Sequence, residues 1–442
     1  MMAKDCSRRR FLGLCAASGT LALPSAMAAD GKVVEPAREL PVAGDFDVIV
    51  AGGGPAGIAA AVASARAGKR TALFETHGCL GGIWTAGLVG CMLDFDKCWT
   101  SGELIRRLEA AGAKCRADRN WFHYEPEYMK AVCEDLCVGS GVAVRLLTSV
   151  VAAVKDASGR NIRAVVTESK SGREAWTAKA FVDATGDGDL AARAGCGFDL
   201  GLRPDGVGQP ASLDALVLVE DADALAPFTM YTSAKDPRGA FRAEMLRAGV
   251  EPSYSIPTMY RLHDHLMVLM SNHEYGVRVD DAAAISAATI RARREVHAQI
   301  AALAKLGGVW KGIRVAATAE QIGHRSARRI HGRYTLTRED VVSGARFPDA
   351  VCESRYPADI HALDAKTGRV QAADTESVKW KPFQIPLRAL RAKDLDNLWM
   401  GGRCISGDPV AHASYRVTGS AVATGEAAGR AAALGANHGP TA

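Results

Sequence analysis

The feature that most constrains the fold is a glycine-rich turn between a buried strand and an alanine-rich helix. The apolar run 47–51 predicts a short buried strand, and Gly52-Gly53-Gly54-Pro55-Ala56-Gly57 follows it directly. We expect a helix over 56–67, which Gly68 ends, and a second strand over 71–74. These segments predict one βαβ unit whose turn has the spacing G-x-G-x-x-G.

The turn has the residue types that dinucleotide binding requires. Gly52 permits the tight turn, Gly54 lets the backbone approach a pyrophosphate, and Gly57 lets helix and strand pack closely. The helix that opens at Pro55 and Ala56 supplies free N–H groups and a positive dipole for the phosphates. Glu75 ends the second strand, where a carboxylate accepts hydrogen bonds from the adenosine ribose hydroxyls.

Three further glycine-rich segments favour FAD over NAD. Gly81-Gly82-Ile83-Trp84-Thr85 comes just after Glu75, and segments 183–189 and 401–406 each follow a predicted buried strand, over 178–182 and 397–400. A last helix, predicted over 419–434, adds a second N-terminus near the flavin edge where reduction builds negative charge. The spacing G-x-G-x-x-A in 186–191 leaves a second site, for NAD(P)H, as an alternative.

With these motifs the chain resembles the FAD-dependent oxidoreductases of the glutathione-reductase structural superfamily. It looks most like the subgroup with G-G-x-x-T-x-G-L, A-T-G-D-G-D and G-R-C-I-S segments, and the resemblance covers about residues 45–435. Further matches lie in 321–330, 356–361 and 384–390. Members often carry Arg-Glu-Ser-Arg-Arg where this chain reads Arg325-Ser326-Ala327-Arg328-Arg329, so the acid of that pattern is absent here.

The motifs and the resemblance together predict residues that contact or frame FAD. The predicted cofactor-binding set is Gly52, Gly54, Pro55, Ala56, Gly57, Glu75, Gly81, Gly82, Thr85, Asp183, Gly186, Asp187, Gly402, Arg403 and Gly419. No metal site is expected, because no His or Cys spacing suggests zinc. The chain also lacks a Cys-x4-Cys pair after Glu75, which argues against disulfide reductase chemistry.

The residues that would contact the substrate are predicted from the arginines and histidines of the sequence. Arg325, with Arg328 and Arg329, could hold a carboxylate, although a solvated helix face is an equal interpretation. His273, His361 or His412 could take the proton as hydride leaves, but a structural role is the default for a single histidine. Trp84 either covers the flavin or fills the core. The predicted catalytic set is His361, His412, Arg325 and Arg416.

The expected fold class is α/β, with a three-layer Rossmann-like FAD-binding domain assembled from separated segments. Residues 45–204 and 391–435 form that domain in this prediction, and 205–390 form an inserted α+β substrate domain. Residues 29–44 read as a linker. Segment 1–28 reads as a twin-arginine signal peptide, with Arg8-Arg9-Arg10-Phe11-Leu12, a short apolar stretch and a small-x-small cleavage site.

The leader and the motifs together predict the reaction and its partners. We expect hydride transfer from a small polar organic substrate to flavin N5, in the periplasm or outside the cell. Partners are the twin-arginine translocase and an electron acceptor, which is oxygen, a quinone or a redox protein. The alternative is an exported flavin-bearing reductase subunit or electron carrier fed by a membrane partner. A net charge of +5, without a basic stripe interleaved with aromatics, gives no reason to expect nucleic acid. We expect no stable membrane span, because the leader's apolar stretch is short and weak.

Overall fold

The computed structural model describes residues 33, 35–118, 120–202, 204–368 and 378–437. The predicted signal peptide lies outside the described residues. The described residues from Pro41 onward form one compact unit, and the fold below is that of this unit alone.

A seven-stranded mixed sheet is the main element of this unit. Its order is β6-β2-β1-β9-β8-β7, and β18 pairs with β9 beyond the end of β8. The neighbouring pairs among β6, β2, β1, β9 and β18 are parallel, whereas β8 and β7 are antiparallel. The strands are β1 (Val42–Ala51), β2 (Thr71–Phe74), β6 (Ala143–Arg145), β7 (Ser149–Lys155), β8 (Ile162–Ser169), β9 (Gly172–Asp183) and β18 (Leu398–Met400). This sheet with its helices confirms the predicted α/β class.

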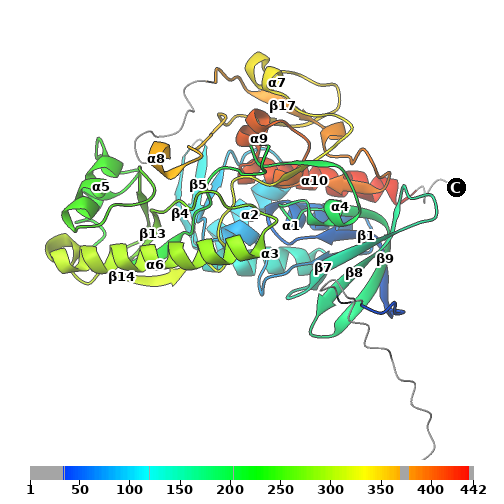
Figure 1. Cartoon of the computed structure of the whole chain (residues 1–442), viewed down its shortest axis with the longest axis horizontal. Helices are drawn as coiled ribbons and strands as arrows, with labels where there is room; N and C mark the ends of the chain where they lie inside the picture. The colour runs from blue at the N-terminus through cyan, green and yellow to red at the C-terminus, as the bar shows by residue number, and fades with distance from the viewer. Residues whose placement is uncertain (1–32, 34, 119, 203, 369–377, 438–442) are drawn as a thin grey trace, which may run out of the picture. The chain divides into compact units, whose positions relative to one another are not determined.

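Two helices from opposite ends of the chain pack together on this sheet. Figure 1 shows α1 (Pro55–Arg66) in blue beside α10 (Thr418–Gly435) in red. Glycines make the close approach possible: a Cβ on Gly425 would lie 2.1 Å from Ala56 O, and one on Gly429 would lie 2.2 Å from Ala60 O. The N-termini of α1 and α10 both adjoin the cavity described below.

A second, antiparallel sheet has its own apolar core. Its order is β12 (Thr258–His263), β13 (Leu266–Met270), β11 (Ala215–Leu218) and β14 (Arg314–Thr318). The long helix α6 (Ala282–Leu306) runs beside β14 in Figure 1. Residues from α5 (Pro237–Arg247) and α6 share a core with this sheet, centred on the fully buried Phe241 and Trp310. The predicted domain boundaries at 204/205 and 390/391 remain predictions.

Short elements complete the unit. The remaining helices are α2 (Trp99–Ala110), α3 (Pro126–Gly139), α4 (Asp189–Arg193), α7 (Arg338–Ser343), α8 (Ala365–Gly368) and α9 (Pro409–Tyr415). The small sheets are β3-β5-β4 (Cys91–Leu93, Trp121–Tyr124, Lys114–Ala117), β10-β15 (Phe198–Leu200, Arg328–Ile330) and β16-β17 (Ala350–Ser354, Phe383–Pro386).

The helices and strands predicted from the sequence are present, with small shifts at their ends. They are β1, β2, β9 and β18 for the strands predicted over 47–51, 71–74, 178–182 and 397–400, and α1 and α10 for the helices predicted over 56–67 and 419–434. Strand β1 begins at Val42, five residues before the predicted strand, and β7 lies in a stretch for which the sequence predicted no strand. Over the described part of the chain, no helix has the length and apolarity to cross a membrane, and no cluster of three or more His, Cys, Asp or Glu side chains could hold a metal ion.

Candidate functional site

A cavity lies at the carboxyl ends of the parallel strands. Strands β2, β1, β9 and β18 end at Phe74, Ala51, Asp183 and Met400, and parallel strands present these ends at one edge of a sheet. Residues that follow all four strands line one cavity of about 1160 Å³, part of which is open to solvent. Open α/β sheets bind their ligands in this position.

The three motif glycines have different roles in the turn after β1. A Cβ on Gly57 would lie 1.8 Å from Gly52 O, and one on Gly52 would lie 2.6 Å from Ala184 O. These two glycines therefore allow strand, turn and helix to pack. A Cβ on Gly54 would meet only Gly82 Cα, at 4.0 Å, so it would point into the cavity. Gly54 keeps open the space that a phosphate needs at the N-terminus of α1.

Glu75 is held rigidly at the end of β2. Its Oε2 accepts a hydrogen bond from Gly53 N at 2.5 Å, and its Oε1 accepts one from His77 N at 2.8 Å. The side chain is nearly buried yet lines the cavity. A carboxylate has about four acceptor positions, so Glu75 keeps acceptor capacity for a pair of ribose hydroxyls.

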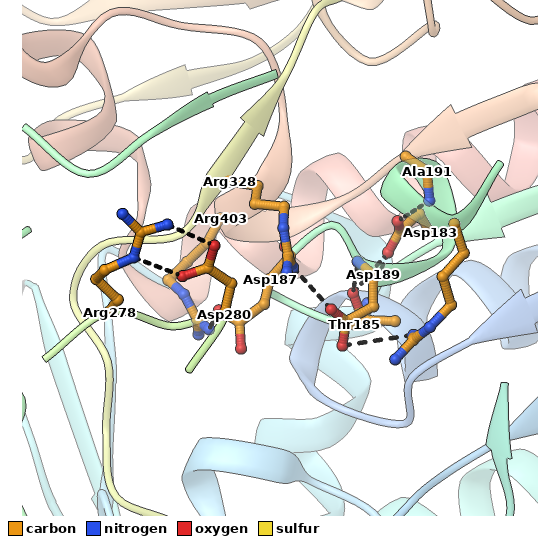
Figure 2. A network of polar contacts seen from close by, with 10 residues as sticks. Asp183, Thr185, Asp187, Asp189, Ala191, Arg278, Asp280, Arg328 and Arg403 are labelled. Carbon is orange, nitrogen blue, oxygen red and sulfur yellow. Dashed lines mark hydrogen bonds and ion pairs between the residues drawn. The ribbon is translucent and has the colours of Figure 1, made fainter. Parts of the chain in front are cut away.

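The turn after β9 is fixed by a network of charged groups (Figure 2). Buried Asp183 accepts hydrogen bonds from Thr185 N, Thr185 Oγ1 and Ala191 N at 3.1, 2.8 and 2.8 Å. Arg328 donates to Asp189 Oδ1 at 2.7 Å and to Asp187 O at 2.9 Å. These contacts close the turn that carries the cavity-lining residues Thr185, Gly186, Asp187 and Asp189.

The segment after β18 meets this turn across the cavity. Arg403 donates to Asp187 Oδ1 at 2.8 Å, and Gly402 N donates to Thr424 Oγ1 at 3.0 Å. Gly402 has φ +83°, a backbone conformation that residues with a side chain rarely adopt. With Thr418 and Ala421 of α10, these residues line the cavity beside a second helix N-terminus.

The structure brings most of the predicted cofactor residues to one cavity. The predicted residues that line it are Gly52, Gly54, Pro55, Ala56, Glu75, Gly82, Gly186, Asp187, Gly402, Arg403 and Arg416. Those that lie behind the lining are Gly57, Gly81, Thr85, Asp183 and Gly419. Thr85 closes the preceding turn by donating to Leu80 O at 2.7 Å, and a Cβ on Gly419 would lie 2.1 Å from Asp94 O. Gly186 and Gly54 line the same cavity, so the G-x-G-x-x-A turn faces the FAD-type site.

Arg416 connects this cavity to a buried polar cluster. It donates to Asp359 O at 2.8 Å and to Asp359 Oδ2 at 3.0 Å, and His361 Nε2 lies 3.2 Å from the same carboxylate oxygen. Burial and the charge of Arg325 lower the pKa of His361 to about 4, although Asp359 opposes the shift. Burial alone would raise the pKa of Asp359, but the hydrogen bond with His361 and the charge of Arg416 lower it overall.

Arg325 belongs to the same cluster and is held by the segment that contains Pro210 and Ser212. Its Nη1 donates to Pro210 O at 2.7 Å and to Ser212 Oγ at 2.8 Å. Among the described residues, no carboxylate forms an ion pair with Arg325, which leaves the rest of its guanidinium group for a ligand. Its positive charge lowers the pKa values of His361, Asp359 and Arg416.

Other predicted residues lie elsewhere. His412 is fully buried, with its ring edge toward Tyr415 at 5.5 Å, and it does not line the cavity. Trp84 is also fully buried, in edge contact with Tyr124. Arg328 and Arg329 do not join Arg325: they lie in strand β15, not on a solvated helix face, and Arg329 donates to Gly407 O at 2.9 Å.

The cluster contains His273, which the sequence offered as a candidate base, and also Gln209 and Asp214, which were not predicted. The ring of His273 packs at a tilt against that of Tyr254, with centroids 4.0 Å apart, and its centroid lies 5.1 Å from that of His361. Gln209 accepts a hydrogen bond from His361 N at 2.9 Å. Asp214, which precedes β11, is buried, and burial raises its pKa to about 7 although Arg325 lowers it. Only its position directly before an apolar run could have drawn attention to Asp214.

The fold and the cavity define a dinucleotide-binding flavoprotein. The residues fit FAD: Gly54 leaves open space at a helix N-terminus, Glu75 offers acceptors for a ribose, and a second helix N-terminus adjoins Gly402. A family model described as FAD dependent oxidoreductase matches residues 47–442. The chain belongs to the FAD-dependent oxidoreductase family, and its cofactor is FAD.

Comparisons with individual proteins add little to this. No curated protein matches the chain. Similar solved structures include a geranylgeranyl bacteriochlorophyll reductase-like protein from Thermoplasma acidophilum (12% identity, 89% of this chain and 78% of that chain, TM-score 0.46). A flavoprotein/dehydrogenase from Cytophaga hutchinsonii has 14% identity over 88% of this chain and 78% of that chain, with TM-score 0.45. A p-nitrophenol 4-monooxygenase from Pseudomonas putida has 14% identity over 65% and 68%, with TM-score 0.39. Likenesses of this size say nothing about the substrate.

Proposed function

We propose that the protein oxidises a small, polar organic substrate by hydride transfer to N5 of FAD. The observation that carries this proposal is the polar cluster of Arg325, Asp359 and His361, which Arg416 joins to the FAD cavity. A buried, charged cluster beside a cofactor cavity favours an enzyme over an electron carrier, because a carrier needs only an exposed flavin edge.

The residues of the cavity have distinct roles in this proposal. Glu75 would hold the adenosine ribose, the turn at Gly54 the pyrophosphate, and the segment at Gly402 and Thr418 the flavin end. When bound, FAD supplies an acceptor for two electrons. Arg325 would bind an anionic or carbonyl group of the substrate, because it lacks an ion-pair partner among the described residues.

Arg416 and Asp359 would position His361, the residue that faces the substrate in this proposal. The ion pair holds Asp359 ionised, and Asp359 in turn orients the ring of His361. His361 is neutral at neutral pH because its pKa is about 4, so it suits hydrogen bonding to a substrate better than proton uptake. His412, whose pKa is lowered by burial and by Arg329, is a weaker candidate base still.

We also propose that the protein works outside the cytoplasm, after export as a folded holoprotein by the twin-arginine translocase. The motif around Arg8 and Arg9 supports this proposal. Since NAD(P)H is not available there, oxygen, a quinone or a redox protein would reoxidise the flavin.

The test is an anaerobic screen of the purified holoprotein. Hydroxy acids, amino acids, sugars, sugar acids, alcohols and amines are each added, and the flavin absorbance is followed. The proposal expects one class to bleach the flavin completely, with one product molecule formed per FAD. Reduction by a redox protein but by none of these compounds would instead favour the flavin-bearing carrier.

A further inference from the structure

Arg416 is a buried cation in the wall of the FAD cavity, and one of its donors is not used by the protein. Its side chain is 12% exposed and lines the cavity, and its Nη2 donates to Asp359 O and Asp359 Oδ2 at 2.8 and 3.0 Å. Among the described residues, no group accepts a hydrogen bond from its buried Nε. Leaving a buried donor without an acceptor costs free energy, so this nitrogen is suited to an acceptor on a ligand.

Arg416 lies at the flavin end of this cavity. Glu75 marks the opposite, ribose end, where Thr148 N donates to Glu75 O at 2.9 Å and Thr148 also lines the cavity. Arg416 comes two residues before α10, whose first residue, Thr418, lines the cavity with it. FAD that extends from Glu75 past the turn at Gly54 would therefore have its flavin at the end where Arg416 lies.

The first turn of α10 adds positive potential at the same end. Val417 occupies the N-cap position of this 18-residue helix and makes no side-chain hydrogen bond to it. The free N–H groups of a first turn carry the positive end of the helix dipole. The guanidinium group of Arg416 and the start of α10 thus present positive charge to one end of the cavity.

The neighbouring carboxylates do not cancel this charge. Asp359, the partner of Arg416, does not line the cavity, so the guanidinium group lies between this carboxylate and the cavity. Arg403 also lines the cavity and is paired with Asp187 at 2.8 Å. Burial lowers the pKa of Arg416, and although Asp359 opposes this, the charges of Arg325 and Arg403 lower it further. Among the described residues, three arginines share two carboxylates here, which leaves positive charge in excess.

We propose that Arg416 donates a hydrogen bond to the flavin edge of FAD that becomes negative on reduction, and that it thereby favours substrate oxidation over the reverse reaction. This inference rests on the proposed function. Hydride transfer breaks a C–H bond of the substrate and gives the flavin two electrons and one proton, so the flavin gains one negative charge. The substrate's second proton goes to solvent as its C=O or C=N bond forms. A charge-assisted hydrogen bond from Arg416 is stronger to the reduced flavin, so it raises the reduction potential of the bound cofactor.

A raised potential also restricts the electron acceptor. The flavin takes electrons readily from a substrate with an alcohol or amine group, and it gives them only to an acceptor of higher potential still, such as oxygen or a quinone. The same flavin is a poor electron donor for reductive chemistry. Arg416 therefore favours an oxidising enzyme over the alternative of a reductase subunit fed by a membrane partner.

The first measurement uses the wild-type holoprotein and needs no substrate. The protein is reduced anaerobically in the presence of a reference dye, and the equilibrium between the flavin and the dye gives the reduction potential. We expect the potential of the bound FAD to be higher than that of free FAD. A potential at or below that of free FAD would overturn the inference, whether or not any variant folds.

The second measurement repeats the titration in variants. Arg416→Met should lower the equilibrium constant for flavin reduction about tenfold, which is about 30 mV for a two-electron couple. Arg416→Lys keeps the charge and should recover most of this loss. Because R416M leaves Asp359 without its arginine, the double variant Arg416→Met/Asp359→Asn is titrated beside it and should show the same loss.

Arg193→Met is the matched control. Arg193 lines the same cavity and lies 3.7 Å from Asp189, but it belongs to α4, which packs against β7 toward the ribose end. R193M should keep the wild-type potential. A wild-type potential in R416M, or an equal loss in R193M, would overturn this inference alone. A wild-type flavin that no compound of the anaerobic screen reduces would overturn the proposed function instead.

Discussion

Arg416 donates two hydrogen bonds to Asp359, one to its backbone oxygen at 2.8 Å and one to its carboxylate at 3.0 Å, while its side chain lines the FAD cavity. The pair joins the C-terminal segment that precedes α10 to the segment that carries His361. Burial lowers the pKa of Arg416 and Asp359 opposes this, while the charge of Arg416 helps to keep the pKa of the buried Asp359 carboxyl low.

The charge of Arg325 should control the protonation of His361. Arg325→Met removes a positive charge that disfavours the imidazolium form, so the pKa of His361 should rise from about 4 by roughly one pH unit toward its ordinary value. Histidine NMR titration measures this. Arg325→Lys keeps the charge and should leave the pKa low; equal values in all three proteins would contradict the proximity of Arg325 to the ring.

Gly54→Val should remove FAD without unfolding the chain. The backbone at Gly54 has φ −76° and ψ −170°, which valine tolerates, and its Cβ would enter open space beside Gly82. The side chain would then occupy the space of the pyrophosphate, and bound FAD should fall below roughly a tenth of the wild-type ratio. Gly139→Ala, where a Cβ meets nothing within 4 Å, is the matched control. Stoichiometric FAD in G54V would place the pyrophosphate elsewhere.

Asp214 should make the protein less stable as pH rises. A carboxyl group whose folded pKa is raised contributes stability that is present below its unfolded pKa and lost as pH rises through the folded value. Here the window runs from about pH 4 to about pH 7. D214N should therefore gain stability over the wild type across this window, on the order of 4 kcal/mol by pH 8. Chemical denaturation at several pH values measures the gain, and a constant difference from pH 4 to pH 8 would refute it.

The export proposal concerns residues outside the described structure. Replacing Arg8 and Arg9 by Lys should block export and leave FAD bound to the retained protein, because the twin-arginine pair is read as an address. Fractionation with flavin assay of each compartment measures both. Normal amounts of the double variant in the periplasm would remove the twin-arginine assignment.

Local patterns were sufficient to predict the FAD half of the site. The strand β1, the glycine turn, α1 and Glu75 lie within 34 residues of sequence (42–75), so spacing alone predicts their arrangement. Helix α6 also carries a local start signal, since Asp281 caps it by accepting hydrogen bonds from Ala283 N and Ala284 N.

The substrate half could not be predicted in the same way. Asp214, Arg325, Asp359 and Arg416 come together only through tertiary packing, and no local pattern marks Asp214 as different from other residues before a strand. The adjacent arginines show the same limit: Arg325 and Arg328 read as one basic cluster, but β15 and the 183–191 turn draw Arg328 to Asp189. Strand β7 was missed because its exposed, alanine-rich face lacks clear alternation.

The most direct test of the account compares flavin reduction in the wild type and in Arg325→Met. With the compound class found in the anaerobic screen, R325M should bind FAD in full and melt as the wild type does. It should bleach about 10- to 150-fold more slowly at low substrate concentration, since a charge-assisted pair contributes about 1.5–3 kcal/mol. Arg333→Met, which removes an exposed arginine paired with Asp396, is the matched control and should bleach normally. Bleaching of R325M at the wild-type rate and concentration dependence would contradict the claim that this cluster binds the substrate.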